Sequence, residues 1–243
     1  MQLLKALESR YDLCYIDKIA HDPRFPVTEN WHCLIDEIIE SIKSQSTQPV
    51  IAVGHSLGGV LSLLAAIEQP SLIKAVVMLD SPLLGRFKSQ VIRLAKTLGL
   101  IDRITPAYRT RGRREHWQNK EQLLDYLKTR DLFKTFTKEC LLDYINYGLK
   151  KTSEGYELRF DRHIEYSIYR TIPHELAAYE GQLAVPAALI YGDESTVVDK
   201  FDVRYMKKNY NIAAYKTQGT HMFPMEHPEE VAEKIFNALD AII

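Results

Sequence analysis

The sequence predicts an α/β protein with a mostly parallel sheet and helices on both of its faces. Short apolar runs rich in β-branched or aromatic residues are bounded by turn residues or charge, which is typical of buried strands. Segments with helical periodicity lie between them, and such alternation favours a parallel sheet. The runs with the strand pattern are Leu13–Asp17, Val50–Gly54, Ala75–Asp80, Ala187–Gly192 and Ile212–Thr217.

Two helices are predicted around the second of these strands. Apolar residues between Trp31 and Ile42 recur at intervals of three and four, so they form one apolar stripe of a helix. The segment from Val60 to Ile67 is apolar on nearly every side, which suits a helix buried against the sheet.

The alternation breaks between Gly85 and about Ser167, where the pattern is helical with a short hairpin around Gly155. An insertion of this size between two core strands predicts a helical cap. The predicted organisation is therefore a first part of the core at residues 1–84, a cap at residues 85–167 and a second part of the core at residues 168–243.

Composition narrows the class of protein. The 243 residues are 46% hydrophobic, with a formal net charge of −1, which gives no overall attraction to nucleic acid or membranes. No apolar run is long enough for a membrane span, and the charged N-terminus lacks a signal-peptide pattern, so a cytoplasmic protein is expected. Cys14, Cys33 and Cys140 lack metal-ligand spacing and are expected to be buried, reduced thiols.

The stretch PVIAVGHSLGG, Pro49–Gly59, has the G-x-S-x-G spacing of a nucleophile elbow where a predicted strand meets a predicted helix. This turn is too tight for side chains at the flanking positions, and Gly54 and Gly58 provide the room. Ser56 is therefore predicted to be a catalytic nucleophile. The amide of Leu57, the first in the helix, is predicted to point at the oxyanion. The alternative is a Gly-Ser turn without a chemical role.

The elbow resembles that of the α/β-hydrolases, and the resemblance covers nearly the whole chain outside the cap. YDLCYIDKIAHDPRFP, Tyr11–Pro26, stands where that fold has its fourth strand and the loop after it. GTHMFPMEHPEEVAEKI, Gly219–Ile235, resembles the histidine loop and last helix of the family. The resemblance implies the α/β-hydrolase fold and a mechanism without a cofactor or metal.

A serine nucleophile needs a base that reaches over the strand ends. His221 follows the last predicted strand and matches the histidine position of the family, although a loop histidine without a catalytic role is the alternative. His227 precedes Pro228 at a helix start and is expected to be structural. His55 flanks the serine and is expected to point away from it.

The acid of the triad is the member that departs from the family pattern. It usually follows the penultimate strand as G-x-x-D, but here the pattern reads GDES and ends in Ser195. The candidates are Asp193, Glu194, Asp199 and Asp80. Asp80 is preferred because it ends the strand after the nucleophile helix, a position that some members of the fold use, and adjacent strand ends bring it beside the histidine loop. A role in capping the following loop is the alternative for Asp80.

The second oxyanion donor normally comes from a loop after an earlier strand, often with a His-Gly pair, and nothing upstream of Ser56 fits. Met1–Tyr11 resembles the helix that follows that loop. The strand before it would lie between Leu13–Asp17 and Val50–Gly54 in the sheet. Met1 is therefore interpreted as an internal start, with a reduced fold that uses another amide as the alternative.

The first part of the cap is basic. From Arg86 to Lys120 there are ten Lys or Arg residues against Asp102 and Glu115. Solvated helix faces are the expected reason, and recognition of an acidic substrate group, a partner or an anionic surface is the alternative. An acidic substrate would be favoured if these side chains face the pocket: Arg109, Arg111, Arg113 or Arg114.

The predicted function is hydrolysis of a carboxylic ester or thioester through an acyl-enzyme on Ser56, by an esterase- or lipase-like enzyme of class EC 3.1. The expected partner is a small-molecule acyl substrate, with no nucleic acid and no membrane span, and a homo-oligomer is left open. The other hypothesis is an inactive hydrolase scaffold that binds a ligand or partner through its cap.

Overall fold

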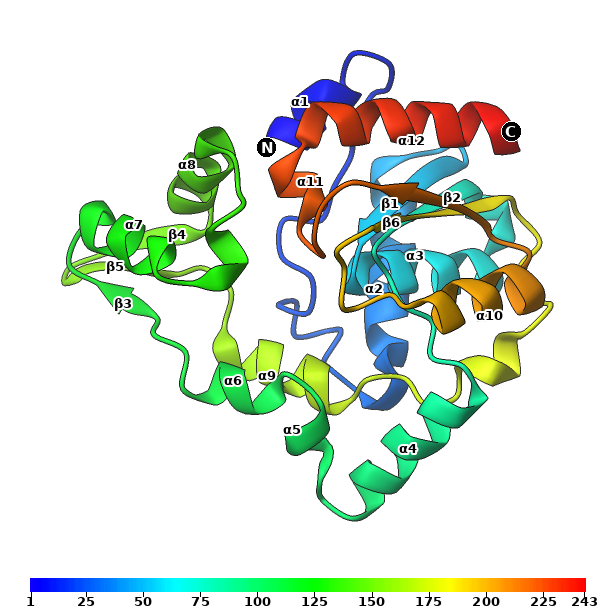
Figure 1. The fold of residues 1–243 in the computed structure, drawn as a ribbon, viewed down its shortest axis with the longest axis horizontal. Helices are drawn as coiled ribbons and strands as arrows, with labels where there is room; N and C mark the ends of the chain where they lie inside the picture. Colours follow the sequence, from blue (N-terminus) through cyan, green and yellow to red (C-terminus); the bar gives the residue numbers. More distant parts are fainter.

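The structure is a computed structural model that describes residues 1–243. Its core is a four-stranded parallel sheet of order β1-β2-β6-β7 (Figure 1). Its strands are β1 (Val50–His55), β2 (Ile73–Leu79), β6 (Ala187–Gly192) and β7 (Ala213–Thr217). The α/β prediction is confirmed, as are four of the five predicted strands.

Helices cover both faces of this sheet (Figure 1). On one face lie α2 (His32–Gln45), α3 (Leu57–Glu68) and α10 (Lys200–Tyr210), and on the other α1 (Gln2–Leu7) and α12 (Pro228–Ile242). Strand β2 serves both cores because successive side chains of a strand point to opposite faces. Val76 and Met78 join the cluster with α2 and α3, whereas Val77 and Leu79 join the cluster with α12.

The predicted strand at Leu13–Asp17 is wrong, because this segment has no regular secondary structure. Strand β1 pairs only with β2, so residues 13–17 have no neighbouring strand to satisfy their backbone groups. The expectation of three buried thiols fails for the same segment. Cys14 is exposed and Cys33 is half-buried, while Cys140 is buried.

Residues 85–167, here called the insert, follow β2 in the chain and precede β6, and they extend away from the sheet (Figure 1). Its helices are α4 (Arg86–Thr97), α5 (Ile101–Ile104), α6 (Ala107–Arg111), α7 (Lys120–Lys128) and α8 (Lys138–Tyr147), followed by α9 (Arg162–Arg170). Strands β3 (His116–Trp117), β4 (Leu149–Thr152) and β5 (Gly155–Leu158) form an antiparallel sheet. The hairpin expected around Gly155 is β4 and β5.

Part of the insert has its own small core, formed by Trp117, Leu123, Leu127, Phe133, Ile145 and Leu149. The boundary expected at residue 167 falls inside α9, because Ile168 of this helix packs into the main core. The remaining elements are α11 (Phe223–Glu226) and the 3-10 turns at Glu29–Trp31, Pro70–Leu72, Asp131–Phe133 and Leu176–Tyr179. None of the helices combines the length and apolar character needed to cross a membrane.

Candidate active site

Ser56 is the single residue between β1 and α3, and its backbone has the positive φ of 53° that a sharp strand-to-helix turn requires. Its amide donates to the carbonyl oxygen of Leu79 on β2, over 2.9 Å. A Cβ at Gly54 would lie 2.2 Å from the backbone of Gly58, so only glycine fits there.

The explanation expected for Gly58 is wrong, because a Cβ at that position would meet nothing within 4 Å. The second close approach is at Gly59 instead, where a Cβ would lie 2.1 Å from the hydroxyl of Ser81. The elbow therefore needs its glycines at the first and last of these three positions. Leu57, as the first residue of α3, has an amide without an intrahelical acceptor.

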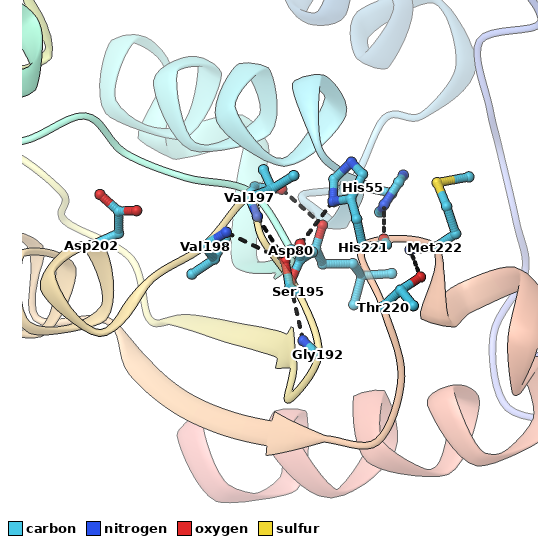
Figure 2. Close-up of polar contacts among 12 residues, drawn as sticks. His55, Asp80, Gly192, Ser195, Val197, Val198, Asp202, Thr220, His221 and Met222 are labelled. Carbon is cyan, nitrogen blue, oxygen red and sulfur yellow. Dashed lines mark hydrogen bonds and ion pairs between the residues drawn. The ribbon is translucent and has the colours of Figure 1, made fainter. Parts of the chain in front are cut away.

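Asp80 lies at the carboxyl end of β2, fully buried, with a positive φ of 46°. Its backbone amide donates to Ile190 over 2.8 Å, which anchors it beside β6. One carboxylate oxygen accepts from the amide of Gly192 over 3.0 Å, and the other accepts from the Ser195 hydroxyl and from Nδ1 of His221 (Figure 2). These three hydrogen bonds hold the buried carboxylate in one orientation.

His221 lies in the loop between β7 and α11, and its Nδ1 is 2.7 Å from Oδ2 of Asp80. Because a carboxylate only accepts, Nδ1 carries the proton in neutral histidine, and the lone pair is on Nε2. The structure records no hydrogen bond between the Ser56 hydroxyl and this ring. It thus brings Asp80 and His221 together, with the Ser56 elbow on the adjacent strand end.

The other candidate acids do not contact His221. The carboxylate of Asp193 is exposed and accepts from the backbone amide of Gly219 over 2.9 Å. Glu194 is also exposed. Asp199 caps the first turn of α10, where it accepts from the amides of Phe201 and Asp202.

His55 is a neighbour of His221 that the sequence analysis placed elsewhere. The expectation that it points away from the site is wrong, since its ring centroid is 4.6 Å from that of His221. Its Nε2 donates to the backbone carbonyl of His221 over 2.8 Å (Figure 2). Burial, and secondarily the nearby His221, lower the pKa of His55 to about 4, which keeps the ring neutral.

Ser195 is a second residue whose role the sequence analysis missed. It occupies the position where the family pattern has an aspartate, and its hydroxyl donates to Asp80. The amide of Val197 donates to the same hydroxyl over 3.0 Å and so fixes its direction. The GDES pattern was the available signal: a serine here is a donor that suits a carboxylate supplied by another strand.

Glu226 is a third such residue, buried in α11. Its carboxylate accepts from the backbone amide of Thr220 over 3.0 Å and from the hydroxyl of the same residue. It also accepts from the hydroxyl of Thr135 in the insert, over 2.6 Å. Glu226 therefore connects the residue before His221 to the insert. The backbone amide of Thr137 in the insert also donates to the carbonyl oxygen of Met225, which precedes Glu226.

Two of the four arginines that could recognise an acidic substrate, Arg113 and Arg114, are engaged within the insert itself. Arg113 donates to Glu165 over 2.6 Å and to the Tyr144 hydroxyl over 2.8 Å. Arg114 donates to the His116 carbonyl. These contacts remove support for recognition of an acidic substrate by either arginine. No three His, Cys, Asp or Glu side chains are grouped so that they could hold a metal ion.

A profile of the alpha/beta hydrolase family matches residues 1–234. An uncharacterized hydrolase of Bacillus subtilis, YugF, is 25% identical over 96% of this chain and 82% of its own length.

Solved structures are similar in fold. The E-2-(acetamidomethylene)succinate hydrolase superposes with a TM-score of 0.69 at 18% identity, over 88% of this chain and 76% of that one. An esterase of Mycobacterium tuberculosis superposes with a TM-score of 0.64 at 17% identity, over 85% of this chain and 68% of the esterase. The thioesterase domain of the curacin pathway superposes with a TM-score of 0.62 at 20% identity, over 84% of this chain and 71% of that domain. With a family profile that spans almost the entire chain and a serine elbow at the end of a parallel strand, the protein belongs to the alpha/beta hydrolase family.

Proposed function

We propose that the protein is a serine hydrolase that cleaves a carboxylic ester or thioester through an acyl-enzyme on Ser56, in class EC 3.1. The hydrogen bond between the buried Asp80 and Nδ1 of His221 carries the proposal. In the neutral imidazole this bond places the proton on Nδ1 and the lone pair on Nε2, as a general base requires, at the strand ends where the Ser56 elbow lies.

In the proposed reaction Ser56 Oγ attacks the acyl carbon while Nε2 of His221 takes its proton. Asp80 holds the imidazole in the required tautomer and stabilises its cation, and the Leu57 amide donates to the oxyanion. His221 returns the proton to the leaving alcohol or thiol. Water, deprotonated by the same nitrogen, then releases the acid and restores Ser56. Residues 85–167 would form the cap over this site.

A small-molecule acyl substrate is consistent with the esterase and thioesterase among the solved structures of similar fold. Neither carries a substrate over to this chain, since their identity is 17% and 20%. The second candidate is an inactive hydrolase scaffold that binds a ligand. The contact of the His55 ring with His221, without a Ser56–His221 hydrogen bond, favours this candidate.

A fluorophosphonate probe separates the two candidates, because it reacts only with an activated serine. Intact-protein mass spectrometry should show one adduct on the wild type and on Ser62→Ala, and none on Ser56→Ala. Ser62 is a matched control because it lies buried six residues further along, in α3. A folded wild type without an adduct would favour the binding scaffold. An adduct would justify comparing esters and thioesters of increasing acyl length.

A further inference from the structure

We propose that helix α4 is an interfacial helix, which binds the protein to the surface of membranes that contain anionic lipids. This goes beyond the proposed hydrolase activity and does not depend on it. The helix would lie in the headgroup region with its apolar side inward, and it would not span the bilayer.

The first observation is a row of large apolar side chains in contact with solvent. Phe87 is 79% exposed, Val91 44%, Leu94 59% and Leu98 60%. Their spacing of four, three and four residues places all of them within a sector of about 60° on the helix. They are called the α4 stripe below. Scattered exposed leucines are common, but an aligned row on one helix is not.

The α4 stripe is not the side of the helix that packs on the protein. Ser89, Ile92 and Ala95 do that, with exposures of 4%, 9% and 7%. Helix α4 is therefore apolar on two sides, one covered by its own chain and one uncovered. Exposed apolar residues continue into the neighbouring short helices with Ile104 (49%) and Tyr108 (55%).

The second observation is positive charge on α4, α5 and α6 that no carboxylate pairs with. Four exposed arginines of the segment form no ion pair within the structure, namely Arg93, Arg103, Arg109 and Arg111. By contrast, Arg86 pairs with Glu180 and Lys88 with Asp202. Because the whole chain has a net charge of −1, the excess of cations in this segment is local.

These two properties together select the occupant. Phe and Leu on one side of a helix, with unpaired arginines on this helix and the two short helices after it, match the chemistry of a bilayer surface with anionic headgroups. A second copy of this chain is a poorer fit. A two-fold symmetric contact through the α4 stripe would bring the same unpaired arginines against one another.

The position of α4 makes such binding useful to the enzyme. The helix begins six residues after Asp80, so it is the first element of the chain beyond the acid of the site (Figure 1). A protein held at the surface by α4 would keep that end of the sheet close to acyl chains in the membrane.

Vesicle flotation tests the proposal with the full chain. Wild-type protein should float with vesicles of equal parts phosphatidylcholine and phosphatidylglycerol, and not with phosphatidylcholine alone, and high salt should weaken the binding. Leu94→Glu should lower the partition coefficient about tenfold or more, because it removes an inserted side chain and adds repulsion. Arg93→Gln, which removes one positive charge, should lower it by a smaller factor, about fivefold.

The matched control is Leu142→Glu, the same change at a leucine of α8 that is 44% exposed and lies outside the α4 stripe. It should bind vesicles as the wild type does. All variants should keep the wild-type melting temperature and far-UV circular dichroism spectrum. The proposal is overturned if the wild type does not float, or if Leu94→Glu and Leu142→Glu bind equally. It is also overturned if light scattering shows a dimer that Leu94→Glu dissociates while flotation is unchanged.

Discussion

At the scale of single residues, Asp80 and Asp193 differ in burial and in whether they contact His221. Asp80 is fully buried, and its carboxylate accepts hydrogen bonds from His221, Ser195 and Gly192. Asp193 is exposed, and its carboxylate accepts one hydrogen bond, from the backbone amide of Gly219. A carboxylate that orients the imidazole of His221 must touch it, and only Asp80 does.

Asp80→Asn should therefore lower esterase turnover by about three to four orders of magnitude, because an amide can present its NH₂ to Nδ1 and favour the wrong tautomer. Asp193→Asn should lower it less than about threefold, since the backbone bond to Gly219 survives an amide. Steady-state kinetics on both variants with one ester is the measurement. A larger loss for Asp193→Asn would reverse the assignment of the acid.

His55 links the site to pH through stability. Its pKa falls from the ordinary 6.5 to about 4 on folding, so the folded protein binds fewer protons at this ring than the unfolded chain does. The stability that depends on the neutral ring is therefore complete above pH 6.5 and is lost as the pH falls toward 4.

Urea unfolding at pH 7 and at pH 4 should show this loss. The wild type should lose about 3 kcal/mol more than His55→Gln between these pH values, at about 1.4 kcal/mol per unit of pKa shift. Glutamine keeps a donor for the His221 carbonyl and does not titrate. Parallel losses in the two proteins would show that His55 is not the group responsible.

At the scale of elements, Glu226 of α11 joins the histidine loop to the insert. Glu226 accepts two hydrogen bonds from Thr220, which precedes His221 in the chain, and one from Thr135 of the insert. A carboxylate is needed because every neighbour in this set is a donor. Glu226 therefore links the insert to the loop that carries His221 through hydrogen bonds.

Glu226→Gln should destabilise the protein by about 1–3 kcal/mol, because an amide turns one NH₂ group toward these donors. Thr135→Val should cost about 0.5–1.5 kcal/mol and lower kcat for the ester more than it raises KM. Thr129→Val is the control, since its hydroxyl bonds only the nearby Tyr126 carbonyl in the same insert. Equal kcat for the two threonine variants would argue against coupling between the insert and the loop.

At the scale of the whole molecule, the hydrophobic cores differ greatly in size. Clusters of 24 and 13 buried residues flank the main sheet, whereas the insert has a cluster of six. The two tryptophans of the chain divide between them, with Trp31 in the largest cluster and Trp117 in the insert. Smaller buried area gives a lower local stability.

Single-tryptophan variants should therefore unfold at different urea concentrations. Trp31→Phe leaves Trp117 to report on the insert, and its fluorescence transition should come at a lower midpoint than that of Trp117→Phe, which leaves Trp31. Far-UV circular dichroism of each variant checks that the substitution itself has not shifted the global transition. Coincident midpoints for both reporters would mean that the insert and the sheet unfold as one unit.

The sequence by itself determined the features that depend on local interactions. Strands β1, β2, β6 and β7 follow from short apolar runs, and the Ser56 elbow follows from steric limits within a few residues. The position of His221 after the last strand was equally readable, because the order of elements along the chain predicts which strand ends meet.

Only the tertiary structure decided which of the four candidate acids contacts His221. Asp80 and His221 are 141 residues apart, and their contact depends on the order β2-β6-β7, in which only β6 separates the strand before Asp80 from the strand before His221. The loss of the strand predicted at residues 13–17 depends in the same way on a partner that β1 does not provide. The exposure of the α4 stripe is also a tertiary property, since helical periodicity identifies the apolar sides of a helix but not which of them the rest of the chain covers.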